Sequence, residues 1–276
     1  MRIAILTSFK EDCTYEDYIL AKSFSQDGHK VDLLDFPSNF DTVNYDLIIL
    51  KNAWLLDEKT YKVYFNELEK FSEKIKKSNC KLISSQDGKL NFDKYGKKYL
   101  VDLFTKGYNV VPTIDNVKNL DKLPIVEKYI KKPYIAYDGF DMEIINQDEL
   151  KNLKLNNEVL QPKLEFISEV QLYFVNDKFQ YALEYSPSKW PDYPTPHEFE
   201  PSQKYIDQAT EIIKLNNASC SFNRVDFLRL NKDEMIILEF ADSNPNLSLP
   251  LLSEKTLNKF LNNFKKAVYE YMEPKQ

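Results

Sequence analysis

The stretch RVDFLRLNKDEMIILEFADSNPNLSL, residues 224–249, decides the fold. Two apolar runs flank the polar residues 231–234, and this pattern predicts a β-hairpin. The pairs that we expect across the hairpin are Leu230–Met235, Leu228–Ile237 and Asp226–Glu239. The last pair places two carboxylates side by side on one face, an arrangement that sheets normally avoid because like charges repel. The hairpin therefore needs something that compensates these charges.

Three interpretations of the carboxylate pair stay open. Arg224 lies diagonally across from Glu239, so the charges can belong to a structural salt bridge. The register can also be slipped, which would separate the carboxylates. The third interpretation is a divalent cation such as Mg²⁺, which binds one or two protein carboxylates together with substrate phosphates.

Composition excludes several classes of protein. The chain has 276 residues with 43% hydrophobic side chains, enough for one large domain or two to three lobes. Its formal charge of −6 argues against binding along a nucleic-acid backbone. Three scattered cysteines predict a reducing compartment, and we expect a cytoplasmic protein without signal peptide or membrane span.

The scarcity of glycine and histidine narrows the chemistry further. Five glycines form neither a GxGxxG nor a GxxxxGK[ST] motif, so Rossmann and Walker A loops are absent from the sequence. Two isolated histidines and three distant cysteines give no zinc spacing. A nucleotide-sugar glycosyltransferase is a weaker possibility, because no Asp-x-Asp triplet follows a predicted strand.

The first 90 residues alternate between strands and helices. Strands are predicted at residues 2–8, 31–36, 46–51 and 81–85, with helices after Thr14 and between residues 57 and 78. This order predicts a small parallel α/β sheet. Later residues change to α+β, with a helix at 94–106, short strands at 120–165, a hairpin at 170–185, a helix at 202–215 and a last helix from Ser253.

Short motifs follow one another in a fixed order. They are Lys97-Lys98-Tyr99-Leu100, Val111-Pro112-Thr113, Lys132-Pro133, Val159-Leu160-Gln161-Pro162, Arg224-Val225-Asp226-Phe227 and Leu238-Glu239. Together they resemble the ATP-grasp superfamily of carboxylate–amine ligases, and most closely the glutathione-synthetase-like branch that includes D-cycloserine ligase. The resemblance implies an ATP-grasp fold of α/β and α+β character. Residues 1–90 would form the N-terminal parallel (pre-ATP-grasp) lobe, and residues 91–276 an ATP-grasp domain whose two α+β lobes enclose the nucleotide, with a small central lobe at about 120–165.

The resemblance also implies a nucleotide site. Lys97 and Lys132 would neutralise the ATP phosphates, although Lys94, Lys98 and Lys131 remain alternatives. Gly139 would let the backbone of its loop approach a phosphate. The remaining residues implied for the nucleotide are Gln161, Pro162, Lys163 and Leu164, which would pass the adenine, and Glu169.

The metal and catalytic residues come from the hairpin and one loop. Asp226 and Glu239 would hold Mg²⁺, or Mn²⁺ instead. The family's further ligand lies two residues after the strand glutamate, where this chain has Ala241, so Asp242 or Asn244 would replace it. Arg224 would steady the transferring group, and Lys189 would supply the charge that family members place as an arginine in the 186–200 loop.

The implied activity is that of a ligase that forms a C–N bond. A small-molecule carboxylate would attack the γ-phosphate to give an acyl phosphate, and an amine would displace phosphate, with release of ADP. A homodimer fits the family. Residues expected near the substrates are Tyr15, Trp54, Ser85, Trp190, Tyr193 and His197. The alternative, motivated by Ala241 and the arginine-free loop, is a catalytically altered nucleotide-binding protein that acts as a sensor or assembly subunit.

Overall fold

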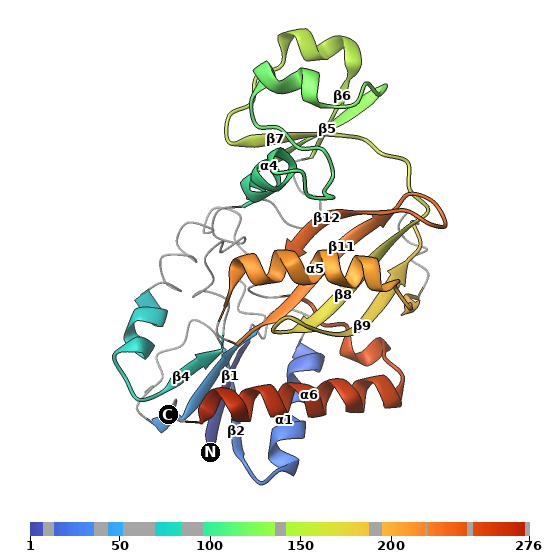
Figure 1. The fold of residues 1–276 in the computed structure, drawn as a ribbon. Helices are drawn as coiled ribbons and strands as arrows, with labels where there is room; N and C mark the ends of the chain where they lie inside the picture. Colours follow the sequence, from blue (N-terminus) through green and yellow to red (C-terminus); the bar gives the residue numbers. More distant parts are fainter. Residues whose placement is uncertain are drawn as a thin grey trace.

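The computed structural model describes residues 1–7, 14–35, 44–51, 70–83, 96–135, 142–187, 195–218, 220–241 and 245–273. Within these residues the strands form three separate sheets. Figure 1 shows the smallest sheet at the top, the largest in the middle and the N-terminal sheet at the bottom. No helix in the described part of the chain is both long and apolar enough for a membrane span.

The N-terminal sheet is parallel, as the sequence predicts. Its strands are β1 (Arg2–Thr7), β2 (Lys30–Asp35), β3 (Leu47–Leu50) and β4 (Lys81–Ile83), in the order β2-β1-β3-β4. All three pairings are parallel. The helix α1 (Thr14–Gln26) packs against β1 and β2. The fully buried run of β3 explains its continuous apolar sequence, which is typical of parallel sheets covered on both faces.

The five-stranded sheet is antiparallel and has the order β10-β9-β8-β11-β12. Its strands are β8 (Ser168–Val175), β9 (Lys178–Tyr185), β10 (His197–Glu198), β11 (Phe222–Arg229) and β12 (Met235–Ala241). The turn between β8 and β9 contains Asn176 at a φ of 54°, a conformation that asparagine tolerates better than most residues. The predicted hairpin at 170–185 is confirmed.

Two helices cover opposite faces of this sheet (Figure 1). The helix α5 (Gln203–Asn216) packs on the face formed by Val170, Leu172 and Phe174. The helix α6 (Glu254–Met272), capped by Ser253, packs on the other face together with α1. That second core also contains residues of β1 and β3, so the N-terminal sheet and the five-stranded sheet share one hydrophobic interior.

The smallest sheet belongs to a separate hydrophobic cluster. It contains β5 (Lys128–Pro133), β6 (Glu143–Asn146) and β7 (Glu158–Pro162) in the order β6-β5-β7, with the short helices η3 (Val117–Lys122) and η4 (Gln147–Asn152). The segment after α4 (Lys98–Thr105) joins the two sheets. Val110 bridges to Ile237 of β12, and Ile114 bridges to Leu160 of β7.

Candidate nucleotide and metal site

A β-bulge sets the register of the hairpin formed by β11 and β12. Near the turn the observed pairs are Arg229–Met235, Leu228–Ile236 and Phe227–Ile237, and the register then shifts between Phe227 and Asp226. The predicted pairs Leu230–Met235 and Leu228–Ile237 are therefore wrong. The predicted pair Asp226–Glu239 is confirmed, because the bulge adds one residue to β12 before Glu239.

The bulge also determines which face Glu239 occupies. Ile237 and Phe240 both pack into the core under α5, although residues three apart in a regular strand point to opposite faces. The extra residue turns Phe240 inward and leaves Glu239 beside Asp226 on the other face. The carboxylate pair is thus a consequence of how the α5 core packs.

Arg224 binds Asp226 and not Glu239. Its Nε and Nη2 each donate to one oxygen of the Asp226 carboxylate at 2.8 Å, a bidentate pair within one strand. Across the ladder Arg224 faces Ala241. The salt bridge between Arg224 and Glu239 that the sequence suggested is therefore wrong. The guanidinium instead compensates the carboxylate of Asp226, one of the two negative charges of the pair.

Asp226 lies in an environment that disfavours its charged form. Only 4% of the residue is exposed. Burial raises the pKa of Asp226 to about 7, and the neighbouring Glu169 and Glu239 add to the rise, while Arg224 opposes it. Arg224 therefore compensates this buried carboxylate only in part.

Two lysines from other elements face these carboxylates. Lys97 is the N-cap of α4, and its Nζ lies 4.0 Å from Oε1 of Glu239. Lys132 of β5 is 9% exposed, and burial lowers its pKa to about 8. Glu239 and Glu169 counteract that fall, and Lys97 adds to it. The structure thus brings together two lysines and the carboxylates of β8, β11 and β12, at the junction between the small and large sheets.

The turn before α4 fixes Lys97 against β5. Gly96 has a φ of +67°, and a Cβ at this position would lie 2.2 Å from the carbonyl oxygen of Tyr134. The amide of Lys97 donates to that same oxygen at 2.7 Å. Because Tyr134 follows Lys132 and Pro133, this close contact holds the two lysines in one geometry.

The alternative lysines differ in their surroundings. Lys131 forms ion pairs with Glu143 at 2.9 Å and Glu158 at 3.3 Å, both within the small lobe. Lys98 is exposed on α4. Neither makes a described contact with Glu239, which favours Lys97 and Lys132.

The side chain of Gln161 is part of the interior. It is 1% exposed and donates to the Thr113 hydroxyl at 2.9 Å, and Thr113 donates to the carbonyl of Val111 at 2.6 Å. The amide of Lys163 donates to the carbonyl of Lys128 at 2.9 Å. Pro162 ends β7, and Leu164 follows in the connection to β8. The Gln161 side chain is thus committed to the interior, so any contact with a base at this position would come from the backbone.

Sequence reasoning missed two polar residues on the same face of β8. Gln171 pairs directly with Asp226 across the ladder, and its Nε2 donates to Oε1 of Glu169 at 2.9 Å. The Tyr173 hydroxyl donates to Oε1 of Gln171 at 2.7 Å. The alternation Glu169, Gln171, Tyr173 along a strand was the available signal, since these residues share one face.

The residues present fit a hard cation that takes few protein ligands. Asp226 and Glu239 lie opposite each other across the ladder and offer carboxylate oxygens, the ligands that a hard cation prefers. Each carboxylate oxygen that accepts from Arg224 retains further lone-pair capacity. In the described part of the chain no group of three or more His, Cys, Asp or Glu residues could hold a metal. This donor set suits Mg²⁺ that is also bound by phosphate oxygens.

Several predicted residues lie outside the described residues: Lys94, Lys189, Gly139, Asp242, Asn244, Trp54, Ser85, Trp190 and Tyr193. Tyr15 is exposed on α1. His197 pairs with Glu184, and its Nε2 lies 3.3 Å from that carboxylate. Arg229 donates to the same carboxylate at 2.7 Å. Ala182 packs under α5, so Glu184 points toward that face, opposite Asp226.

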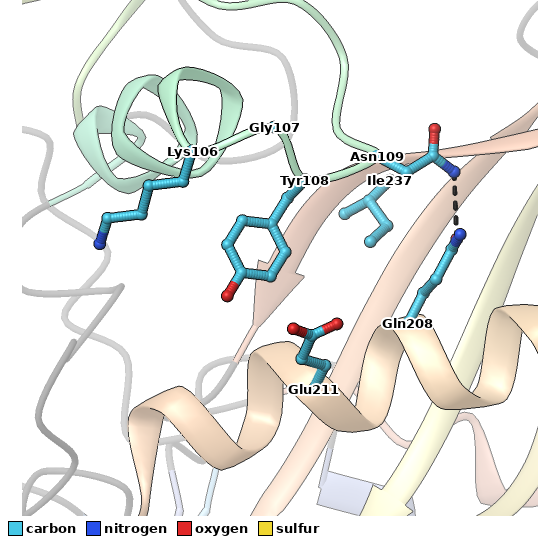
Figure 2. Close-up of a pocket in the computed structure, with 7 residues that line it drawn as sticks. All are labelled: Lys106, Gly107, Tyr108, Asn109, Gln208, Glu211 and Ile237. Atoms are coloured by element: carbon cyan, nitrogen blue, oxygen red, sulfur yellow. Dashed lines mark hydrogen bonds between the residues drawn. The ribbon is translucent and has the colours of Figure 1, made fainter.

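A cleft also lies on the α5 side (Figure 2). It has a volume of about 440 Å³ and is lined by Lys106, Gly107, Tyr108, Asn109, Gln208, Glu211 and Ile237. Asn109 donates to Gln208 at 3.0 Å and to the carbonyl of Met235 at 2.9 Å. None of the residues implied for ATP lines this cleft.

Solved structures share this architecture over almost the whole chain. A D-cycloserine synthetase, DcsG, is 19% identical with a TM-score of 0.74, covering 99% of this chain and 100% of its own. A D-alanine–D-alanine ligase from Bacillus anthracis, complexed with ATP, is 13% identical with a TM-score of 0.65, covering 99% and 97%. A RiPP-associated ATP-grasp ligase from Chryseobacterium gregarium is 14% identical with a TM-score of 0.64, covering 95% and 96%.

The chain has the ATP-grasp fold, as the resemblance implied. No protein-family model and no curated protein matches the sequence. The structural neighbours include ligases of small molecules and ligases complexed with peptides. Identities below 20% leave activity and substrates to be argued from the site.

Proposed function

We propose that this protein is an ATP- and Mg²⁺-dependent ligase that joins a carboxylate to an amine or a similar nucleophile. The observation that carries the proposal is the convergence of Lys97 and Lys132 with Asp226 and Glu239 at the junction of two sheets. Separate elements supply all four residues. Cations beside a carboxylate pair are the arrangement that binds a metal-complexed polyphosphate.

The proposed roles follow from the contacts. Lys97 and Lys132 neutralise the phosphates of ATP, and phosphate charge would keep Lys132 protonated despite its burial. Asp226 and Glu239 hold Mg²⁺, which when bound compensates charge on the phosphates. Arg224 uses two of its five N–H donors on Asp226 and directs the others at the transferring phosphoryl group. Gly139, Lys189, Asp242 and Asn244 remain proposed members of the site.

The proposed reaction has two steps. An oxygen of the substrate carboxylate attacks the γ-phosphorus, the bond to ADP breaks, and an acyl phosphate forms. The amine then attacks the acyl carbon, phosphate leaves, and the nitrogen loses a proton to solvent. Arg224 stabilises the negative charge that develops in both steps.

We infer a small-molecule carboxylate as the first candidate substrate, supported by the high mutual coverage with D-cycloserine synthetase. A peptide substrate is the second candidate, because other neighbours are complexed with a leader and core peptide or a precursor peptide. Release of ADP and phosphate that requires both a carboxylate and an amine, measured with panels of amino acids and of peptides, separates the two.

The first test is binding of a nonhydrolysable ATP analogue with Mg²⁺, followed by thermal unfolding. At about a hundred times its dissociation constant the analogue should stabilise the protein by roughly 2.7 kcal/mol. Asp226→Asn should remove the part of this stabilisation that depends on Mg²⁺. Asp32→Asn is the matched control, since Asp32 also accepts from an arginine, Arg2, but in the N-terminal sheet.

The outcomes separate the hypotheses. If the wild-type protein shows no stabilisation, the nucleotide site is refuted. Binding without turnover for any carboxylate and amine would favour the alternative, a nucleotide-binding sensor or assembly subunit, which is motivated by Ala241 at the position of the family's further ligand and by the arginine-free 186–200 loop.

A further inference from the structure

A buried ion pair joins the N-terminal sheet to the segment that follows β12. Glu16 of α1 is 3% exposed, and Lys51, directly after β3, is fully buried. Besides their mutual contact, Lys51 donates to the carbonyl of Pro245 at 2.8 Å. The amide of Leu247 donates to both oxygens of Glu16, at 3.2 and 2.9 Å. Three regions distant in sequence therefore meet at one buried pair of charges.

This pair fixes the backbone on the N-terminal side of Ser248. Ser248 has a φ of 51°, a left-handed conformation that residues other than glycine rarely adopt. The Tyr181 hydroxyl donates to the carbonyl of Leu247 at 2.5 Å, and the amide of Ser248 donates to Oδ1 of Asn246 at 2.9 Å. A disfavoured conformation persists when its surroundings over-determine it, and these contacts do so.

Ser248 begins a hydrogen-bonded chain that ends at the nucleotide site. Its Oγ lies 3.1 Å from the Tyr185 hydroxyl and 3.3 Å from the Tyr173 hydroxyl. Tyr173 uses its single proton on Gln171, so Ser248 must supply the proton between itself and Tyr173. Because Oε1 of Gln171 accepts from Tyr173, its amide nitrogen faces Glu169. The chain has one direction, and its last acceptor is a carboxylate.

We propose that Glu16 and Lys51 are positioning residues that hold Ser248, and through Tyr173 and Gln171 orient the carboxylate of Glu169. The inference rests on the proposed nucleotide site, because Glu169 acts there beside Asp226 and Lys132. The N-terminal lobe thereby controls the orientation of a carboxylate in the nucleotide site, although it supplies none of the proposed ligands of the nucleotide or the metal.

The experiment compares two buried tyrosines that lose the same atom. Tyr173→Phe interrupts the chain, whereas Tyr205→Phe removes a hydroxyl that contacts Asp233 and Met235 on the α5 side. Calorimetry measures the affinity of each folded variant for a nonhydrolysable ATP analogue with Mg²⁺, and urea unfolding measures the stability of each variant. Ser248→Ala is the second interruption, and the double variant Glu16→Gln with Lys51→Met removes the anchor without leaving one charge unpaired.

We expect Tyr173→Phe, Ser248→Ala and the double variant each to weaken binding by about tenfold, as expected for loss of one hydrogen bond to a charged group. Tyr205→Phe should leave the affinity unchanged. A merely structural role lowers the free energy of unfolding but leaves the affinity of the folded protein unchanged.

Two failures are distinguishable. If the wild-type protein binds no analogue, the proposed nucleotide site falls and this inference falls with it. If the wild-type protein binds and the chain variants match Tyr205→Phe in affinity, the positioning role is refuted while the ligase proposal stands. Should the double variant fail to fold, Ser248→Ala and Tyr173→Phe still decide the matter.

Discussion

Gly96→Ala should be far more damaging than an alanine at another left-handed glycine. The new Cβ would lie 2.2 Å from the carbonyl oxygen and 2.5 Å from the carbonyl carbon of Tyr134. Both atoms are backbone, so the turn or the end of β5 must move. Movement would stretch the 2.7 Å hydrogen bond that Lys97 donates to the same oxygen.

The magnitude follows from the matched position Gly107. Its φ of +83° resembles the +67° of Gly96, but a Cβ there meets nothing within 4 Å. Gly107→Ala should therefore cost only the left-handed strain, about 1–2 kcal/mol. Gly96→Ala adds the displaced backbone and the weakened hydrogen bond, another 1–3 kcal/mol in order of magnitude.

Urea unfolding measures both variants, and calorimetry with an ATP analogue and Mg²⁺ measures the function of the turn. Lys97 should shift away from Glu239 in Gly96→Ala, so the affinity of the analogue should fall on the order of tenfold. Gly107→Ala should bind as the wild-type protein does. Equal destabilisation of the two variants, or an unchanged affinity in Gly96→Ala, would refute the reasoning.

Three further predictions concern single groups. Lys132→Met should raise the free energy of unfolding at pH 7 by about 3 kcal/mol, since burial lowers the lysine's pKa from 10.5 to about 8, while analogue binding measured by calorimetry is lost. The native state holds the Asp226 proton to about pH 7 and the unfolded chain loses it near 3.8, so this group's contribution to stability falls as pH rises between those values. Because Mg²⁺ competes with the Asp226 proton, the affinity of the protein for Mg²⁺, measured by calorimetry, should increase about tenfold from pH 6 to pH 8. A pH-independent affinity would exclude Asp226 as a ligand. Tyr99→Phe should cost about 1–3 kcal/mol in urea unfolding, because it leaves the buried amide of Phe240 without the hydroxyl that accepts at 2.7 Å; no loss would mean that another acceptor replaces it.

The order of strands and helices was predictable because hydrophobic periodicity and turn residues indicate each element locally. Residues 47–50, the centre of the run at 46–51, are all apolar, and β3 is buried in a parallel sheet. The hairpin predicted at 170–185 turns at Asn176, a residue type that favours such turns. Ser253 was expected to start the last helix, and its hydroxyl accepts from the amide of Thr256. These signals are local, so one sequence suffices to read them.

The hairpin register was only half predictable, because a bulge depends on tertiary packing. Counting residues back from the turn placed Leu228 opposite Ile237, but Phe227 occupies that position so that both can pack under α5. The bulge then restores the pairing of Asp226 with Glu239. Likewise, Glu16 reads as an ordinary first-turn acid and Lys51 as the polar end of a strand. Only the fold places them beside residues 245–247.

The salt bridge and the metal site, considered as alternatives for the hairpin, are compatible states of the same residues. Arg224 compensates Asp226 through both carboxylate oxygens, yet burial and two neighbouring glutamates still raise the pKa of Asp226 to about 7. The guanidinium therefore holds the carboxylate in place without satisfying the whole charge. We infer that a cation shared with Glu239 supplies the remainder, and that Arg224 keeps Asp226 correctly oriented before the cation arrives. On this view Arg224→Lys, which retains the charge but loses the bidentate fork, should weaken Mg²⁺ binding, whereas a simple rivalry between arginine and metal would strengthen it.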